Sequence, residues 1–488
     1  MEQEFATAGT SALSTQDTPT EAVRSHWRPR RHFAPARNWM NDPNGMVYLD
    51  GVFHLLFQYN PGDSVWGDIH WGHATSRDLL NWEEQPVALA SEPDGLGMIF
   101  SGGAVVDGEN TSGFQRGDRP PLVATFTHHD KHEVQVQSLA VSTDGGQSWE
   151  KYPHNPVIAN PGIKDFRDPK VIWHRAGGHW VMVLAVGDRV HFYRSGDLKD
   201  WALAGEFGRT RGAHGGVWEC PDLFPLPVPD GKERWCLLVS INPGGPNGGS
   251  ATQYFIGDFD GEAFVPEHED IRWLDYGTDN YAGVTWDGLQ RVDDRRLLIG
   301  WMSNWQYANK VPTSLWRGAM TIPRELSLYR DRDTLRLANG PAREVDKARR
   351  RVAAMQLRAG NSISPPGDSA LDLVLKIGEA PELELEFSTG IGERLLLALS
   401  AERGELLVDR RESGWMEEGF GCEISAPLVH GLHRDSELRI LIDGSSMEIF
   451  IDGGKTALTA LFFSSEPLSR MALRRTASAA VPLALYRL

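Results

Sequence analysis

The feature that most constrains the fold is a short phrase that recurs in the first two thirds of the chain. It reads SRDLLNW at 76–82, STDGGQSW at 142–149, SGDLKDW at 195–201 and, more weakly, GDFDGEAF at 257–264. Each copy lies between two strand-like runs, so it predicts a hairpin connection whose Asp stabilises the turn and whose aromatic residue packs on the next strand. A recurrence of about 50–65 residues made of short strands is typical of β-propeller blades. With the unmatched stretch 281–330, the four copies predict five blades.

The texture of the sequence changes after about residue 335. Residues 336–355 are rich in Arg, Lys and Glu and predict a charged linker with a short helix. Beyond them, LELEF at 383–387 alternates apolar and polar residues, and LRILI at 438–442 leads through Asp-Gly into MEIFI at 447–451. Such runs are typical of half-buried strands in a meander. The predicted fold class is therefore all-β, with an arm at 1–27, a propeller at 28–335, the linker at 336–355 and a β-sandwich at 356–488.

Composition limits the classes of partner. At 488 residues the chain is long enough for two domains, and its net charge of −17 argues against nucleic acid or an anionic membrane as a partner. Seventeen Trp residues suit the stacking of sugar rings, and three Cys residues form no disulfide framework. The polar N-terminus lacks the apolar core of a signal peptide, so we expect a flexible arm there and a cytoplasmic location.

Three acidic residues stand beside aromatic residues or prolines and are candidates for catalysis. Asp42 lies in the turn-rich heptapeptide WMNDPNG at 39–45, Asp168 in FRDPK at 166–170, and Glu219 in VWECPD at 217–222. Singly, each has a structural explanation: a hairpin tip, an ion pair, a buried acid. Together, on successive blades, they would supply the two carboxyls of glycoside hydrolysis and a third charged group. We expect amides of the heptapeptide to keep Asp42 ionised, Trp218 to help keep Glu219 protonated, and Arg167 to lower the pKa of Asp168.

At these motifs the chain resembles glycoside hydrolase family 32, the β-fructosidases that include invertases, exo-inulinases and levanases. The resemblance covers about residues 28–488 and extends to SMEIF at 446–450 in the predicted sandwich. It implies a five-bladed propeller followed by a β-sandwich, with Asp42 as nucleophile, Glu219 as general acid/base and Asp168 as transition-state stabiliser. It also implies a substrate-binding set, namely Trp39, Asn41, Gln58, Trp66, Phe100, Ser101, Arg167 and Trp301. Trp305 competes with Trp301 to line the fructose site, and Tyr281 is a further candidate.

The activity implied by the resemblance is that of a retaining exo-β-fructosidase. Such an enzyme releases terminal fructose from sucrose, fructooligosaccharides, inulin or levan through a covalent fructosyl-enzyme intermediate, with no cofactor and no metal. The partner expected is a sugar substrate, without nucleic acid or membrane. Chain-length preference, linkage preference and oligomeric state are not determined by the sequence.

Other functions stay open at this stage. A fructosyltransferase would use the same residues with a sugar as acceptor, and a non-catalytic sugar-binding propeller would need the tryptophans but not all three acids. The phrase at 142–149 also resembles a sialidase Asp-box, but sialidases use a Tyr nucleophile and no arginine cluster for a sugar carboxylate is evident. Histidines 128, 129 and 132 are interpreted as a solvated loop, because their spacing is not that of a zinc motif.

Overall fold

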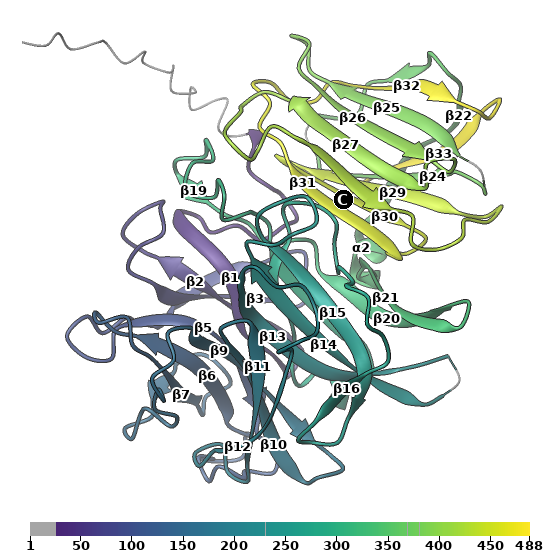
Figure 1. The fold of residues 1–488 in the computed structure, drawn as a ribbon. Coiled ribbons are helices and arrows are strands. Elements are labelled where there is room, and N and C mark those ends of the chain that lie inside the picture. The colour runs from purple at the N-terminus through teal and green to yellow at the C-terminus, as the bar shows by residue number, and fades with distance from the viewer. Residues whose placement is uncertain (1–25, 230, 368, 380) are drawn as a thin grey trace, which may run out of the picture.

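The computed structural model describes residues 26–488 except 230, 368 and 380, so all but the last two residues of the expected arm lie outside the described part. It contains two β domains, drawn in purple to teal and in green to yellow in Figure 1. The N-terminal domain has five sheets, and each contains a four-stranded antiparallel meander. The predicted class, a five-bladed propeller followed by a β-sandwich, is confirmed.

The blades follow one another along the chain. Blade one has β1 (Asn38–Leu49), β2 (Val52–Asn60), β3 (His70–Ser76) and β4 (Glu83–Leu89), with the short β19 (Trp316–Arg317) added beside β1. Blade two has β5 (Met98–Val106), β6 (Leu122–His129), β7 (Gln135–Ser142) and β8 (Glu150–Lys151). Blade three has β9 (Phe166–His174), β10 (His179–Val186), β11 (Arg189–Ser195) and β12 (Ala202–Phe207). Blade four has β13 (Val217–Pro227), β14 (Glu233–Asn242), β15 (Ala251–Phe259) and β16 (Phe264–Pro266). Blade five has β17 (Tyr281–Thr285), β18 (Arg296–Trp301), β20 (Arg324–Asp331) and β21 (Thr334–Pro341), with the 3₁₀ turn η1 (Leu289–Arg291) between its first two strands.

The first strand of each blade lies at the axis. Contacts run from β1 to β5, from β5 to β9, from β9 to β13, from β13 to β17 and from β17 back to β1, which closes the ring. Buried apolar side chains fill the spaces between neighbouring blades. The beginnings of the five inner strands therefore meet at one end of the axis, and their ends meet at the other.

The recurring phrase joins the third and fourth strand of blades one to four. In each copy the Asp carboxylate accepts backbone amides from its own turn, as Asp144 does from residues 147 and 148 at 3.0 Å and Asp260 does from residues 262 and 263 at 2.8–2.9 Å. The turn prediction is confirmed.

The C-terminal domain consists of two six-stranded sheets packed face to face. One contains β22 (Arg350–Leu357), β33 (Val481–Arg487), β24 (Leu371–Lys376), β29 (Glu437–Asp443), β30 (Ser446–Ile451) and β31 (Thr456–Leu461). The other contains β23 (Ser362–Ile363), β32 (Arg470–Thr476), β25 (Glu382–Ser388), β26 (Arg394–Ser400), β27 (Glu405–Glu412) and β28 (Glu423–Pro427). Alternate apolar residues of both sheets, such as Leu385 and Ile440, form the core between them.

Two expected boundaries differ from what the structure shows. The expected linker at 336–355 is mostly strand: β21 continues to Pro341, β22 begins at Arg350, and only the helix α2 (Arg343–Ala348) lies between them. The expected arm ended at residue 27, but Trp27 is buried and its indole donates to the Ser464 carbonyl at 2.7 Å. An apolar indole with a partnered N–H is stabilised by this packing, so the attached part of the chain includes Trp27.

Buried ion pairs connect the two domains. Arg324 of β20 donates to Asp275 at 2.7 Å and to Glu448 of β30, and Arg410 of β27 donates to Asp279 at 2.7 Å. His32 lies between Asp443 at 2.9 Å and Glu448 at 2.7 Å. Paired charges of this kind are costly to separate, which holds the sandwich against the propeller. In the part of the chain that the structure describes, no helix is long and apolar enough to cross a membrane.

Candidate active site

A pocket of about 420 Å³ opens where the inner strands of the propeller begin. Eight of the predicted site residues line it: Asn41, Asp42, Gln58, Trp66, Phe100, Arg167, Asp168 and Glu219. The three acids come from blades one, three and four rather than from successive blades. Blade two contributes Ser101, which bonds Asp42, and blade five contributes Tyr281, which bonds Glu219.

The heptapeptide that carries Asp42 is not a turn. Residues 38–49 form β1, and the register against β2 shifts twice, between Met40 and Pro43 and between Asn44 and Val47. The turn-forming residues are used for these two bulges, and Gly45 takes a positive φ of 50°. A β-bulge bends a strand and re-aims its side chains, so the irregularity of β1 directs Asp42 into the pocket.

Side chains surround the Asp42 carboxylate. Asn41 donates to Oδ1 at 3.1 Å, while Ser101 Oγ at 2.6 Å, Gln58 Nε2 at 3.3 Å and Cys220 Sγ at 3.4 Å donate to Oδ2. The donors are therefore side chains from three different blades, of which only Asn41 belongs to the heptapeptide, rather than the expected amides around residues 43–45. Burial raises the pKa of Asp42 to about 6, against the effect of Ser101 and the other donors, which lower it.

Glu219 lies in β13 with about a fifth of its side chain exposed to the pocket. Its Oε1 accepts two hydrogen bonds from the Arg167 guanidinium at 3.0 and 3.2 Å, and its Oε2 accepts the Tyr281 hydroxyl. Trp218, which was expected to help keep Glu219 protonated, does not line the pocket. Successive strand residues face opposite sides, and the fully buried Trp218 packs between blades three and four.

Asp168 is held by strained backbone and by its neighbour in space, Cys220. Its φ is 65°, which is costly for a residue other than glycine, and its own amide donates to Thr127 Oγ1 at 3.0 Å. Its Oδ2 accepts the Cys220 amide at 3.0 Å. Backbone strain that is held by surrounding contacts is typical of functional positions.

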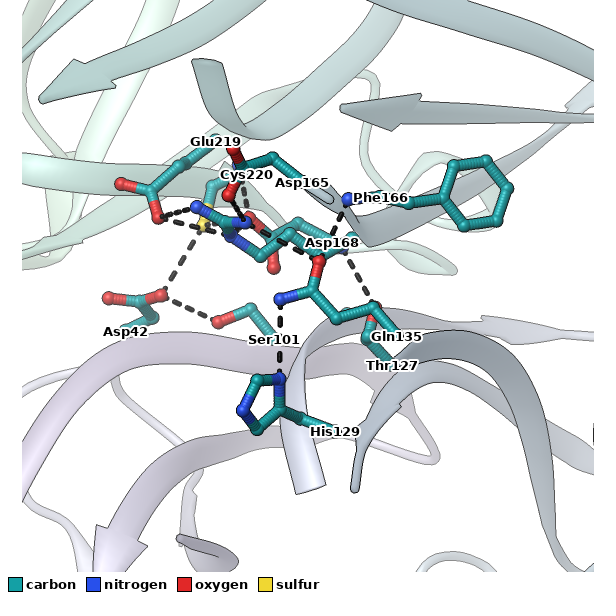
Figure 2. Close-up of polar contacts among 12 residues, drawn as sticks. Asp42, Ser101, Thr127, His129, Gln135, Asp165, Phe166, Asp168, Glu219 and Cys220 are labelled. Carbon is teal, nitrogen blue, oxygen red and sulfur yellow. Dashed lines mark hydrogen bonds and ion pairs between the residues drawn. The ribbon is translucent and has the colours of Figure 1, made fainter. Parts of the chain in front are cut away.

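Arg167 does lower the pKa of Asp168, as expected, but the net pKa of Asp168 is raised, so the expected permanently charged group is not found. The guanidinium is directed at Glu219 and at Asp165, 2.7 Å away, and its Nε is 3.9 Å from Asp168. Burial and the carboxylates of Glu219 and Asp42 outweigh Arg167 and raise the pKa of Asp168 to about 7. Figure 2 shows Asp42, Asp168 and Glu219 gathered around Cys220.

Of the two tryptophans that compete for the fructose site, Trp305 lines the pocket, together with Trp66, and Trp301 does not. Trp301 is fully buried, with its ring 4.9 Å from Trp305, so it lies behind the pocket wall. Trp39 is likewise fully buried, stacks 5.9 Å from Trp305 and donates to Asn41 at 2.7 Å. These two predicted binding residues therefore position Trp305 and Asn41 rather than contact a ligand.

Several lining residues were missed from the sequence. They are His129, Glu133, Gln135, Lys164 and Asp165, which come from blades two and three and carry no motif. Gln135 Oε1 accepts Arg167 at 3.4 Å, and His129 stacks on Phe100 with ring centres 4.4 Å apart. The three histidines expected in a solvated loop lie in different environments. His128 is buried against Ser138, His129 lines the pocket, and only His132 of the three is exposed. Only Lys164 and Asp165, next to the motif at 166–170, could have been suspected from their position.

Comparison with known proteins identifies relatives over nearly the whole described chain. Residues 32–340 match the model of the glycosyl hydrolases family 32 N-terminal domain, and residues 341–485 match that of the family 32 C-terminal domain. A levanase of Bacillus subtilis is 46% identical over 471 residues, covering 92% of this chain and 68% of the levanase. An extracellular exo-inulinase of Aspergillus niger is 39% identical, covering 90% of each chain.

Solved structures agree with these matches. The exo-inulinase of Aspergillus awamori superposes with a TM-score of 0.87 and 36% identity, covering 97% of this chain and 99% of that one. A β-fructofuranosidase of Schwanniomyces occidentalis complexed with fructosyl-erythritol superposes with a TM-score of 0.83 and 30% identity, covering 94% and 98%.

Proposed function

The chain belongs to glycosyl hydrolase family 32 and is a glycoside hydrolase that acts on fructosides, and from this premise we propose that Asp42, Glu219 and Asp168 make it a retaining exo-β-fructosidase. One observation carries the assignment: all three carboxyl groups converge on Cys220. The Cys220 amide donates to Asp168 and its thiol to Asp42, and the Glu219 carboxylate is close enough to raise the pKa of both acids. A terminal fructosyl group in the pocket that these acids line would meet all three.

In the first step, Asp42 attacks the anomeric carbon while Glu219 protonates the departing glycosidic oxygen. Because the pKa of Asp42 is about 6, this carboxylate is mostly ionised at neutral pH and can act as the nucleophile. Glu219 faces the pocket with Oε2 beside the Tyr281 hydroxyl. In the second step, Glu219 takes a proton from water, which attacks the same carbon from the opposite face to Asp42 and releases fructose with retained configuration.

Asp168 and the pocket wall bind the sugar. Retention of the anomeric configuration requires about 5–5.5 Å between the carboxyl groups of the nucleophile, Asp42, and the acid, Glu219. As the ring becomes cationic, an anionic Asp168 beside it gains interaction energy that the ground state lacks, which lowers the barrier. Trp305, Trp66 and Phe100 supply apolar surface for the ring.

The expected substrates are sucrose and the chain ends of β-fructans. A pocket of about 420 Å³ is at the small end of ligand sites and suits one or two sugar rings rather than an extended chain. This favours release of single terminal residues. The levanase and exo-inulinase relatives support fructans as substrates in addition to sucrose.

Initial rates on sucrose, 1-kestose, inulin and levan, measured in parallel, test this proposal. Glu219→Gln should lower kcat by roughly 10²–10⁴-fold, the usual range for general acid/base catalysis. Glu262→Gln is the matched control, since Glu262 is an exposed acid on the same blade paired with Arg194. Undiminished activity of Glu219→Gln would refute the mechanism, whereas a wild type that binds these sugars but hydrolyses none of them would favour a non-catalytic binding propeller.

Two product measurements separate the remaining alternatives. With methanol as acceptor, a retaining enzyme forms the methyl β-fructofuranoside, and the α-anomer would exclude Asp42 as nucleophile. At high sucrose, accumulation of oligosaccharides longer than sucrose in place of free fructose would identify a fructosyltransferase.

A further inference from the structure

A second and larger cavity lies at the opposite end of the propeller axis. Its volume is about 810 Å³, roughly twice that of the active-site pocket. Its walls come from the connections between first and second strands in blades two to five, at residues 106–111, 172–176, 225–227, 233–235 and 287–296. Strand β9 reaches both sites: Asp168 is near its start and Trp173 near its end, five residues or ~16 Å further along. We call this second cavity the far-mouth cavity.

Two tryptophans face the far-mouth cavity in fixed positions. Trp173 of blade three and Trp235 of blade four are only partly buried, although each is backed by another ring. Trp173 packs edge-on against Trp180 at 5.0 Å, and Trp235 packs against Phe259 at 5.2 Å. Within the described part of the chain, neither indole N–H donates a hydrogen bond to protein. Rigid aromatic surfaces with free polar edges are typical of ligand sites.

The polar lining is of mixed charge. Three arginines and five acids line the far-mouth cavity: Arg175, Arg291, Arg296, Asp107, Glu109, Glu233, Asp287 and Asp294. Arg296 is 8% exposed, and its Nε has no hydrogen-bond partner in the described structure. The five acids would repel a free anion, and the three arginines would repel a cation. A neutral polyhydroxyl ligand can accept from the arginines, donate to the acids and stack on the indoles.

We propose that the far-mouth cavity binds a stretch of β-fructan chain, as a second carbohydrate site that tethers polymeric substrate to the enzyme. The inference rests on the proposed function for its choice of sugar. Because the propeller body separates the far-mouth cavity from the active-site pocket, the fructosyl units bound in the far-mouth cavity are not the ones being cleaved. Tethering raises the concentration of chain ends near the active-site pocket, which benefits inulin and levan but not sucrose.

Two sets of variants test the tether. Trp173→Ala/Trp235→Ala removes the aromatic surfaces, and Ala176→Trp places an indole at the mouth from an exposed turn without removing packing. Ala479→Trp is the matched control at an exposed turn of the sandwich. Each is made in the wild type for kinetics and in Glu219→Gln for binding, measured as retardation in native gels containing inulin, levan or dextran.

The tether predicts that both far-mouth variants raise KM for long inulin or levan at least threefold, keep kcat/KM for sucrose within twofold, and lose retardation in fructan gels. Ala479→Trp should behave as the wild type. Unchanged retardation and unchanged polymer KM in Ala176→Trp would overturn the proposal, as would equal retardation of the Glu219→Gln protein by dextran. Failure of the wild type to hydrolyse sucrose would instead count against the proposed function, which separates the two.

Discussion

Ser101→Ala should move the acid limb of the activity profile upward. Ser101 Oγ donates to Asp42 Oδ2 at 2.6 Å, the shortest of the hydrogen bonds that the carboxylate accepts. Burial raises the pKa of Asp42 to about 6, and the Ser101 hydrogen bond is the largest influence that opposes it. Removal of this donor leaves the ionised form less stable.

The size of the shift follows from the strength of the bond. A hydrogen bond to a charged group contributes roughly 1.5–3 kcal/mol, which corresponds to about 1–2 pKa units. The pKa of Asp42 should therefore rise from about 6 toward 7 or above. At pH 7 the ionised fraction would fall from about 90% to about 50% or less, since each pKa unit is a factor of ten in the equilibrium.

The assay is kcat/KM on sucrose from pH 4 to 9, because this ratio reports the ionisation of the free enzyme. Ser138→Ala is the matched control: Ser138 is a buried serine of the same blade that bonds His128 instead of a site acid. Cys220→Ala, which removes a weaker donor, should shift the limb less. If the plateau of Ser101→Ala fell while its acid limb coincided with that of the wild type, Ser101 would act only in sugar binding and the reasoning would be refuted.

Three other predictions concern the domain contact, the pocket wall and the thiols. Burial lowers the pKa of His32, but hydrogen bonds to Asp443 and Glu448 raise it more, to about 9. Protonation of His32 therefore contributes about 3 kcal/mol to the free energy of unfolding. This contribution is complete below pH 6.5 and is lost as the pH rises through 9. Urea unfolding of His32→Gln should thus show a large deficit at pH 6 that narrows by pH 9, and a pH-independent gap would contradict this. Trp305→Ala should raise KM for sucrose roughly 3–10-fold, from the about 0.5–1.5 kcal/mol of an aromatic contact, with Trp305→Phe intermediate, and an unchanged KM would remove Trp305 from the sugar site. Maleimide should modify Cys422 before Cys220, because Cys220 is 4% exposed and burial raises its thiol pKa well above the usual value, and mass spectrometry of the peptides decides between them.

The propeller could be predicted because its signal is local. The carboxylate of Asp78 or Asp144 bonds amides two to four residues away, so the whole turn is visible in one short phrase. The spacing of the phrases then gives the size of a blade. The alternating strands of the sandwich are local signals of the same kind.

The site could be predicted only as far as its motifs reach. The sequence shows the acids, but their partners lie far along the chain: Glu219 is 52 residues from Arg167, and Asp42 is 59 residues from Ser101. Adjacency in sequence does not determine the charge state of Asp168, because burial outweighs the neighbouring Arg167. Sequence also does not distinguish Trp301 from Trp305, and Trp301, at the end of its strand, is fully buried behind the pocket wall.

The charge balance of the pocket explains why it suits a neutral sugar. Asp42, Asp168, Glu219 and Asp165 share the pocket with one guanidinium, that of Arg167, so their full ionisation would leave an excess of negative charge. Burial is the main cause of the raised pKa values of Asp42 and Asp168, and the neighbouring carboxylates add to it. In the proposed mechanism, a cationic ring in the transition state would relieve the excess and favour the ionised form of Asp168 as the charge develops. The interaction would then be stronger in the transition state than with the neutral substrate, which is the condition for catalysis rather than binding alone. On this reasoning Arg167 is as necessary as the acids, because without it Glu219 would lose two hydrogen bonds and the three carboxyls would face one another unscreened.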